Sequence, residues 1–448
     1  MGVNRRSFIK YASLAAAGNA AALRPFGVLN ALAQSPTDYK ALVCVFLFGG
    51  NDANNTVVPF DTQGYANYAA IRGPLALPQT GTGALLQLGG LPNFALNPNL
   101  PDIATLFNSK NVALVANVGT LVEPTTKAQY QAGAVVPTNL FSHPDQQLEW
   151  QNASQSGTTT TGWAGRIADQ LNSAYNSGAQ VPMITSVAGD TLFCNGSAST
   201  PVSVSPGNLS GAQCSEGTTE CGAQLATAQA LLSFDSGLTL VQADNSITTN
   251  AYAYAKTLSA AVQSVSPLKT VFPTGGLGAQ LQQIAQIIQV RAALGVSRQI
   301  FFCGIGNFDT HSNQLALQNA LLAGISPALA AFYNATVEIG VQNSVTSFTM
   351  SDFSRTFQPN SNTGSDHAWG SHHIVMGGAV KGGQMYGTFP TLALGGPDDS
   401  GSNGRWVPST GSVQYAATLA SWFGVSAAQM PAIFPNIGSF ATANLGFV

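Results

Sequence analysis

Aspartate side chains that could bind a metal follow three apolar segments of the chain. Asp52 follows the segment 41–48, Asp309 follows 300–305 and Asp352 follows 345–350. In open α/β sheets, ligands bind beyond the carboxyl ends of the strands, so these side chains are expected to meet at one edge of a sheet. Taken alone, Asp52 is more typical of a turn or of a helix N-cap than of a metal ligand.

All five histidines of the chain lie in or beside such polar segments: His143, His311, His367, His372 and His373. Aspartate and histidine hold zinc-like ions while leaving positions open for a substrate. Three carboxylates in one pocket would also repel one another without a compensating cation. We therefore expect a site for zinc or manganese, whose candidate ligands are Asp52, Asp309, His311, Asp352, Asp366 and His367. Each histidine taken singly is also typical of a structural role.

A candidate nucleophile precedes a helical pattern at 144–152. The hydroxyl of Ser142 would gain from the positive end of the helix dipole. The same Ser-x-x-Asp pattern with an early proline is also ordinary N-capping. Arg355 could bind an anionic group bidentately, or pair with an aspartate near it in the sequence. Ser142, His143 and Arg355 are thus the candidate catalytic residues.

The elements that must position these residues form an α/β pattern. Six short, nearly continuous apolar segments predict parallel strands covered on both faces: 41–48, 112–118, 183–187, 300–305, 345–350 and 374–376. Helical patterns lie between them, at Leu277, Leu281, Ile284 and Ile288 and over 314–333, where Pro327 should kink or split the helix. We predict an α/β fold with a mostly parallel sheet flanked by helices.

The amino-terminal segment has the pattern of an export signal. Arg5 and Arg6 are followed by Ser-Phe-Ile-Lys, then by an Ala-rich stretch and by small residues around Ala33. This pattern predicts a twin-arginine signal over residues 1–34, recognised by the twin-arginine translocon, and a periplasmic or secreted protein. No later stretch has 18 uninterrupted apolar residues, so no transmembrane anchor is expected in the mature chain.

The remaining residues, 35–448, are expected to form one domain with an insertion or cap at about 189–266. That region starts polar and then becomes helical, and it contains Cys194, Cys214 and Cys221. In an oxidising compartment Cys214 and Cys221 could close a small loop, but the sequence alone does not fix the pairing.

Composition limits the classes of partner. Charged residues make up 8% of the chain, the net charge is -3, and no basic run follows the signal. Nucleic-acid binding needs clustered Lys and Arg, so it is excluded. A surface covered by Ser, Thr, Asn, Gln and Gly suits a small anionic or carbohydrate ligand.

The motifs taken together resemble a known bacterial family. In order, they are Gly-Gly-x-Asp at 49–52, Ser-His at 142–143, Gly-Trp-x-Gly-Arg at 162–166, Phe-Asp-Thr-His at 308–311, Ser-Asp-Phe-x-Arg-Thr at 351–356, Asp-His-x-Trp-Gly at 366–370 and Gly-Gly-x-Val-Lys-Gly-Gly at 377–383. This order resembles the family called domain of unknown function 1501, which is grouped with the alkaline phosphatase and sulfatase superfamily. The resemblance implies an alkaline-phosphatase-like fold over nearly the whole mature chain, without implying a demonstrated reaction.

The resemblance also implies roles for single residues. Asp52 would be the first-strand ligand, Ser142 the nucleophile, Asp352 the strand-end aspartate and His367 the later histidine, with Asp309 and His311 as the Asp/His pair. Two positions depart from the superfamily pattern. Phe353 stands where a metal-binding histidine is usual, although Asp366 and His367 can replace it, and Asp309 and His311 are closer together than the usual pair. The chain has no Cys-x-Pro-x-Arg, so a formylglycine sulfatase is not expected.

Two functions follow from these expectations. The first is a metal-dependent hydrolase of phosphate or sulfate esters, in which the metal polarises the ester. The alternative is a non-catalytic periplasmic or cell-envelope binding protein on a degenerate phosphatase fold, with the His/Asp clusters as hydrogen-bond networks.

Overall fold

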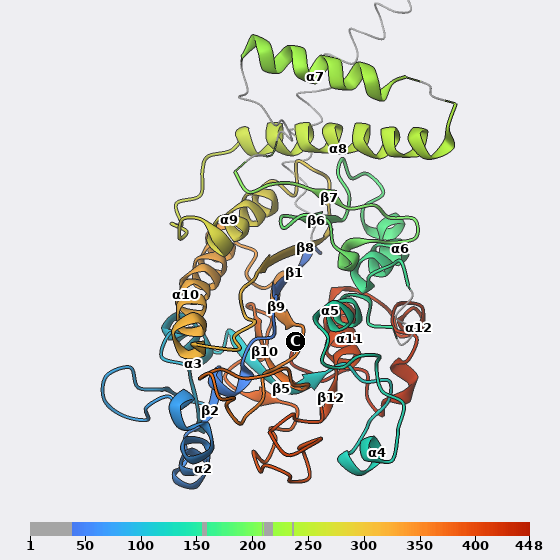
Figure 1. Cartoon of the computed structure of the whole chain (residues 1–448). Coiled ribbons are helices and arrows are strands. Elements are labelled where there is room, and N and C mark those ends of the chain that lie inside the picture. Colours follow the sequence, from blue (N-terminus) through green and yellow to red (C-terminus); the bar gives the residue numbers. More distant parts are fainter. Residues whose placement is uncertain (1–37, 155–158, 208, 210–217, 235–236) are drawn as a thin grey trace, which may run out of the picture.

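The structure is a computed structural model that describes residues 38–154, 159–207, 209, 218–234 and 237–448 (Figure 1). The expected signal peptide, 1–34, lies outside the described residues. Its export role therefore stays a prediction.

A nine-stranded sheet forms the centre of the molecule, with the strand order β11-β5-β10-β9-β1-β8-β6-β7 and β12 paired to β5. The bounds are β1 Lys40–Leu47, β5 Val112–Gly119, β6 Ile184–Ser186, β7 Val202–Ser203, β8 Arg298–Ile305, β9 Val345–Ser351, β10 Ser371–Met376, β11 Met385–Tyr386 and β12 Thr410–Gly411. All neighbouring pairs are parallel except those of β10, which runs antiparallel to both β5 and β9. The predicted mostly parallel α/β sheet is confirmed, and each of the six predicted strands is present.

Strand β1 lies between β8 and β9 and is buried on both faces. Val43 and Val45 pack into the core on one face, while Leu42, Cys44 and Phe46 pack into the core on the other. Because successive side chains of a strand point to opposite faces, a strand covered on both sides must be apolar at nearly every position. This explains the continuous apolar segment in the sequence.

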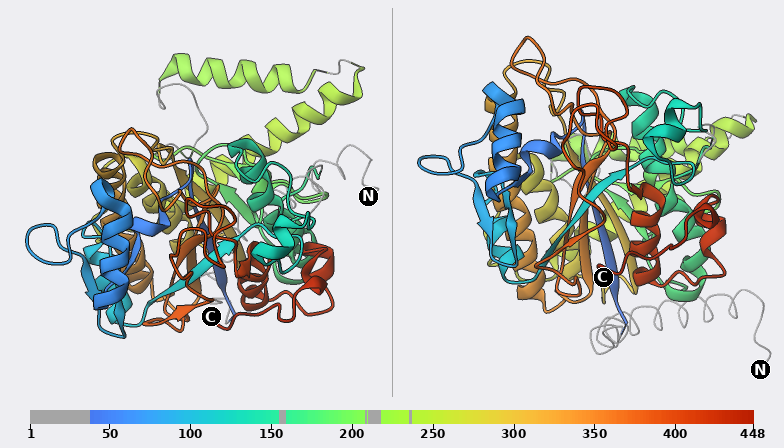
Figure 2. Two further views of the ribbon diagram at one scale, coloured as in Figure 1. Left: turned by 60° about the horizontal axis from the view of Figure 1, so that its bottom comes forward. Right: turned by 90° about the horizontal axis from the view of Figure 1, so that it is seen from below.

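Helices cover both faces of this sheet (Figures 1 and 2). One face carries α3 (Pro101–Asn108), α9 (Gly276–Gln289) and α10 (Gln314–Ile339). The other carries α5 (His143–Asn152), α6 (Trp163–Tyr175), α11 (Ser412–Phe423) and α12 (Met430–Ile433). The smaller elements are η1 Ala53–Asn55, α2 Thr62–Arg72, η2 Gly73–Leu75, α4 Lys127–Gln131, η3 Leu192–Cys194, η4 Ile437–Ser439 and a second sheet of β2 Val57–Pro59, β4 Leu91–Leu96 and β3 Leu86–Leu88.

Helix α10 continues through Pro327 from Gln314 to Ile339, so of the predicted kink or split at this proline the split does not occur. Burial of Leu322, Ile325 and Leu329 against the sheet holds the helix on both sides of the proline. Within the described part of the chain, α10 is the one helix that is long and apolar enough to cross a membrane. It packs beside α9 and α3 in the way that a core helix does.

The segment predicted as an insertion divides into two parts. Strand β7 pairs with β6 and extends the main sheet, whereas α7 (Thr219–Leu232) and α8 (Thr239–Gln263) form a hairpin that projects beyond it (Figure 1). Cys221 at the start of α7 is disulfide-bonded, while Cys44, Cys194 and Cys303 are free and buried. Cys214, one of the partners that the sequence left open for Cys221, lies outside the described residues.

Candidate metal centre

Short turns after β1, β8 and β9 bring the candidate site together at the carboxyl end of the sheet. Gly49 and Gly50 follow β1 with φ values of +111° and +83°. A Cβ atom on Gly49 would lie 2.4 Å from the backbone nitrogen of Asp309, so glycine lets the turn after β8 pack directly against the turn after β1. This contact fixes the position of Asp309.

Three imidazole nitrogens converge on one carboxylate oxygen of Asp309. The Nε2 atom of His311 lies 2.9 Å from Oδ1 of Asp309, and those of His143 and His367 lie 3.5 Å from it. The Nε2 atoms of His311 and His367 are 3.0 Å apart. These four residues, His143, Asp309, His311 and His367, are candidate metal ligands, and we call them the metal cluster for that reason.

The opposite nitrogen of each imidazole is held by an acceptor. Nδ1 of His143 lies 2.7 Å from Oδ2 of Asp352, and Nδ1 of His311 lies 3.2 Å from Oδ1 of Asp366. Nδ1 of His367 lies 2.7 Å from a backbone oxygen, that of Phe141. Each acceptor favours the tautomer with the proton on Nδ1, which turns the lone pair of Nε2 towards Asp309.

The cluster fits a divalent ion such as zinc. Nε2 of His143 is buried without a hydrogen-bond partner, and it belongs with Asp309 and His367 to a group whose ligand atoms lie within 4.8 Å of one another. Zinc ligands at about 2.0–2.2 Å in a tetrahedral site are about 3.3 Å apart, close to the separations observed here. Side chains of Asp309 and His311 are 47% and 45% exposed, so the cluster opens to solvent.

The electrostatics of the cluster follow from its charged partners. The hydrogen bond to Asp352 raises the pKa of His143, whereas burial lowers the pKa of His367. Burial alone would raise the pKa of Asp309, but Arg355 and His311 more than offset it and hold that pKa below its ordinary value. Asp309 therefore stays ionised, as a metal ligand must.

The candidate ligand Asp52 lies at the same end of the sheet but outside the metal cluster. Its carboxylate is fully buried, forms an ion pair with Arg72 and accepts hydrogen bonds from Gln314 and from the backbone of Asn54. It caps the short helix η1, which is the turn or cap role left open by the sequence. In this structure Asp52 is a structural ion-pair residue.

Asp352 and Asp366 lie next to the cluster and contact its histidines through Nδ1. Asp352 is fully buried and also accepts from Gln147 and from the backbone of Gly49. Both aspartates therefore orient ligands. The sequence analysis predicted both as metal ligands, whereas His143, predicted there as a catalytic residue, supplies one of the three Nε2 atoms that converge on Asp309.

The candidate catalytic residues differ in their surroundings. Ser142 is the N-cap residue of α5, but its hydroxyl donates to the Asp145 carboxylate and makes no capping bond to the backbone. Arg355 is buried, and its guanidinium donates to Asp309 at 3.0 Å and to the backbone oxygens of Ser365 and Gly49. Arg355 thus positions Asp309 and has little capacity left for a ligand.

Arg405 is a candidate functional residue that the sequence reasoning missed. Its Nε donates to the backbone oxygen of His367 at 2.8 Å, and its guanidinium carbon lies 4.3 Å from the ring centroid of Phe141. The hydrogen bonds of the described residues use only its Nε, and the residue is partly exposed. The sequence contained one indication of Arg405: charged residues are rare in this chain, and this arginine lies outside the recognised motifs.

His372 and His373 do not join the metal cluster. Both lie in β10 and are buried in the core, where Nδ1 of His372 accepts from the backbone of Asn117 and the ring of His373 packs on Trp150 and Tyr415. Burial lowers the pKa of each to about 3, so both are neutral.

The family described as protein of unknown function DUF1501 matches residues 39–400. The chain belongs to this family. The resemblance inferred from the motifs is therefore confirmed. No curated protein matches the DUF1501 chain.

Several solved structures are similar to this DUF1501 protein at low identity. Ps i-CgsB in complex with k-i-k-neocarrahexaose is 10% identical, with 89% of this chain and 77% of that chain covered and a TM-score of 0.35. A protein in the alkaline phosphatase superfamily from Vibrio parahaemolyticus is 10% identical, covering 87% and 67% at a TM-score of 0.34. The lipoteichoic acid synthase LtaP from Listeria monocytogenes is 7% identical, covering 88% and 76% at 0.36. Because these TM-scores are low, the fold class of the DUF1501 chain is taken from its own strand order and pairing.

Proposed function

We propose that this protein is a metal-dependent hydrolase of phosphate or sulfate esters. The observation that supports this most is the convergence of three Nε2 atoms on Oδ1 of Asp309, with each imidazole oriented through its Nδ1. Histidine with one carboxylate is the donor set that favours zinc, with manganese as the second choice.

The residues of the cluster have separate tasks in this proposal. His143, His311, His367 and Asp309 hold the ion, while Asp352 and Asp366 keep His143 and His311 in the binding tautomer. A divalent ion bound there would polarise the ester and lower the pKa of a water or hydroxyl beside it.

Arg405 is proposed to bind the anionic end of the ester. Its free Nη donors lie beside the backbone of His367, and a guanidinium binds phosphate or sulfate oxygens through two parallel hydrogen bonds. Binding there would place the ester next to the metal cluster.

Ser142 is the candidate nucleophile of this proposal. It precedes His143 at the start of α5, where the helix dipole favours a developing negative charge. The Asp145 carboxylate already accepts the hydrogen of its hydroxyl, so it can take that proton as the serine attacks the ester. Retained hydrolysis in Ser142→Ala would instead assign the attack to water.

We also propose that the protein acts in the periplasm or is secreted, after export by the twin-arginine translocon. The Arg5-Arg6 motif and the disulfide of Cys221 support this, because disulfides persist in oxidising compartments.

Metal content and hydrolysis, measured together on mature protein purified without chelators or a His-tag, test the proposal. We expect about one divalent ion per chain in the wild type, and hydrolysis of at least one aryl phosphate or aryl sulfate. His143→Gln and Asp309→Asn should lose the ion, whereas Asp190→Asn, an exposed aspartate elsewhere, should keep it. Metal-free wild-type protein whose Tm is unmoved by EDTA, zinc or manganese would contradict the proposal and favour the binding-protein alternative.

A further inference from the structure

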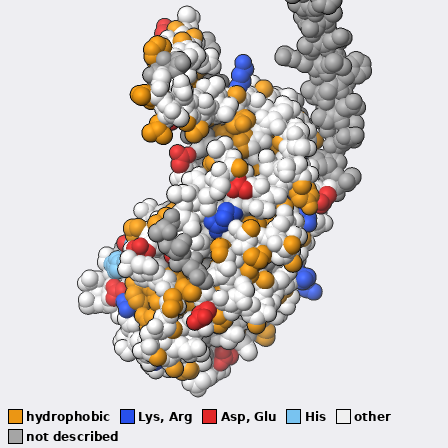
Figure 3. Space-filling model, turned by 90° about the vertical axis from the view of Figure 1, so that its right-hand side faces the viewer, with side chains coloured by type: hydrophobic (Ala, Val, Ile, Leu, Met, Phe, Trp, Pro, Cys, Tyr) orange, Lys and Arg blue, Asp and Glu red, His pale blue; other side chains and the backbone are white. Residues whose placement is uncertain are grey.

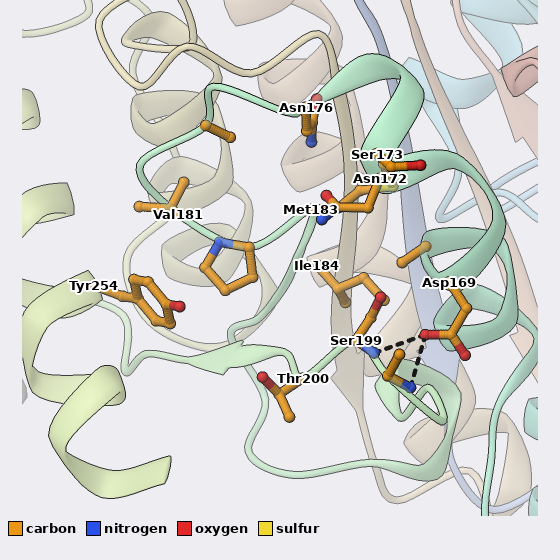
Figure 4. A pocket seen from close by; sticks show the side chains of 14 residues that line it. Asp169, Asn172, Ser173, Asn176, Val181, Met183, Ile184, Ser199, Thr200 and Tyr254 are labelled. Carbon is orange, nitrogen blue, oxygen red and sulfur yellow. Dashed lines mark hydrogen bonds between the residues drawn. The ribbon is translucent and has the colours of Figure 1, made fainter. Parts of the chain in front are cut away.

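A second pocket lies far from the metal cluster, at the opposite end of the sheet. Its walls come from α6, from the segment leading into β6, from the loop before β7 and from α8, and its volume is about 390 Å³ (Figure 4). Strand β6 runs parallel to β8 and, through it, to β1. The pocket adjoins the beginning of β6, whereas the metal cluster follows the ends of β8 and β9, so the two sites are separate.

The polar side chains of this pocket are neutral and hydrogen-bond in both directions. Asn172 and Ser173 from α6, Thr200 from the loop before β7 and Tyr254 from α8 line it. An amide or a hydroxyl can both donate and accept. The hydrogen bonds of the described residues leave these four side chains available to a ligand.

The one charged group of the pocket is already hydrogen-bonded within the protein. Asp169 is the one acidic residue among the lining residues, and no Lys, Arg or His is among them. Its Oδ2 accepts from the backbone of Ser197 at 2.7 Å, and its Oδ1 accepts from those of Ser199 and Ala198 at 2.7 and 3.1 Å (Figure 4). An anion would find no cation there, and a cation would compete with three backbone donors.

These three hydrogen bonds also fix the rim of the pocket. They tie the loop at 197–199 to α6, so the wall that carries Thr200 is formed before a ligand arrives. A preformed wall lowers the entropy cost of binding.

An apolar surface lies beside the polar groups. Tyr254, Val181, Met183 and Ile184 line the pocket, and Figure 4 shows Tyr254 and Val181 on the left side of the view with Met183 and Ile184 nearer its centre. A ring with C–H groups on its face and hydroxyls around its edge matches an aromatic wall surrounded by amides and hydroxyls. Tyr254 is the one aromatic residue in the lining, so one face of a ring can stack there.

We propose that this pocket binds a neutral saccharide unit, with Tyr254 stacking on the sugar ring and Asn172, Ser173 and Thr200 binding its hydroxyls. The pocket shares no residue with the metal cluster, so the proposal goes beyond the hydrolase function and does not depend on it.

Saturation-transfer NMR on the full mature protein tests this with a fixed panel of neutral probes: the methyl glycosides of glucose, mannose and galactose, and N-acetylglucosamine. At least one probe should bind saturably. Tyr254→Ala should weaken that binding at least about tenfold, the effect expected for a truncated aromatic anchor, while Tyr254→Phe should retain most of it. Tyr252→Ala is the matched control, because Tyr252 lies two residues earlier in α8 and lines a different pocket with α7. It should leave binding unchanged.

Other outcomes would overturn the proposal. They are absence of saturable binding for every probe, equal binding by wild type and Tyr254→Ala in protein with unchanged circular dichroism, or loss of binding on adding inorganic phosphate or sulfate. Binding should also survive His143→Gln, and its loss there would contradict the separation of the two sites. A failed hydrolase assay with intact saccharide binding would therefore reject only the hydrolase function.

Discussion

At the scale of single residues, the partner of each aspartate decides its role. Asp52, Asp309 and Asp352 all follow strands of the same sheet, and each was predicted as a metal ligand for that reason. Asp52 instead contacts the buried Arg72, and Asp352 contacts Nδ1 of His143. Only Asp309 faces the Nε2 atoms. These roles depend on which side chains from distant segments lie opposite, and sequence spacing does not contain that information.

Replacing Asp52 should damage folding and leave metal binding in the folded fraction intact. Asp52→Asn leaves the guanidinium of Arg72 buried and unpaired, which typically costs about 3–5 kcal/mol. We expect this loss in urea unfolding, together with an unchanged ratio of metal to folded protein. Asp309→Asn is the matched comparison. It should lose the metal, while the free energy of unfolding of the metal-free protein should fall by less than in Asp52→Asn. Loss of metal from folded Asp52→Asn protein would return Asp52 to the ligand set.

At the scale of elements, the sequence predicts where the strands that carry the site lie better than it predicts their direction in the sheet. Strand β1 and the segment 300–305 of β8 are mostly apolar because helices cover both faces of the sheet, and this pattern is visible in the sequence, whereas β9 alternates apolar residues with buried Thr and Ser. The segment 374–376 has the same pattern, yet β10 runs antiparallel to its neighbours. Burial sets the pattern of a central strand whatever its direction. Similarly, Pro327 predicted a break in a helix that packing keeps continuous.

The turn after β1 should tolerate no side chain at Gly49. In Gly49→Ala the new Cβ would meet the backbone of Asp309 at a φ of +111°, where L residues are strained. We expect a loss of more than about 1 kcal/mol in unfolding free energy, and weaker zinc binding because Asp309 must move. Gly438→Ala provides the control, since nothing lies within 4 Å of its added Cβ. Zinc affinity equal to that of the wild type would show that this turn does not position Asp309.

The histidines of β10 should make the protein sensitive to acid. Burial holds the pKa of His372 and His373 at about 3, below the ordinary value of 6.5, so the unfolded state takes up protons first as pH falls. Their contribution to stability is complete above about pH 6.5 and is lost progressively towards pH 3, at about 1.4 kcal/mol per pH unit for each histidine. His373→Phe should flatten the fall between pH 7 and 4.5, measured by urea unfolding in EDTA. An equally steep fall in the variant would assign the acid sensitivity to other groups.

At the scale of the whole molecule, a small number of charges covers a large surface. Figure 3 shows scattered acidic and basic side chains among polar and backbone atoms on one face. The projecting α7–α8 hairpin adds exposed apolar side chains, among them Leu231, Leu238 and Leu240. Composition predicted this neutral surface. Composition does not predict that the α7–α8 hairpin lies beyond β6 and β7.

Export remains to be tested on the whole chain. Arg5→Lys combined with Arg6→Lys should leave unprocessed precursor in the cytoplasm, because the paired guanidinium groups are the recognised feature of the signal. Cell fractionation and blotting measure this, with Lys10→Arg as a control that keeps the pair. Mature-size protein in the periplasm of the double variant would contradict the twin-arginine assignment.

The position of β1 between β8 and β9 has a consequence for biosynthesis. Lys40 pairs with Arg298, and Ala41 pairs with Val345, so the first strand to leave the ribosome meets its neighbours only after most of the chain has been made. Pairing over such sequence distances is slow, and the waiting apolar strand is prone to aggregate. A nascent chain of this kind needs protection by chaperones until its last strands emerge. If the chain crossed a membrane unfolded during its synthesis, β1 would be separated from β8 and β9 before they could pair. Translocation of the folded protein would keep the three strands together.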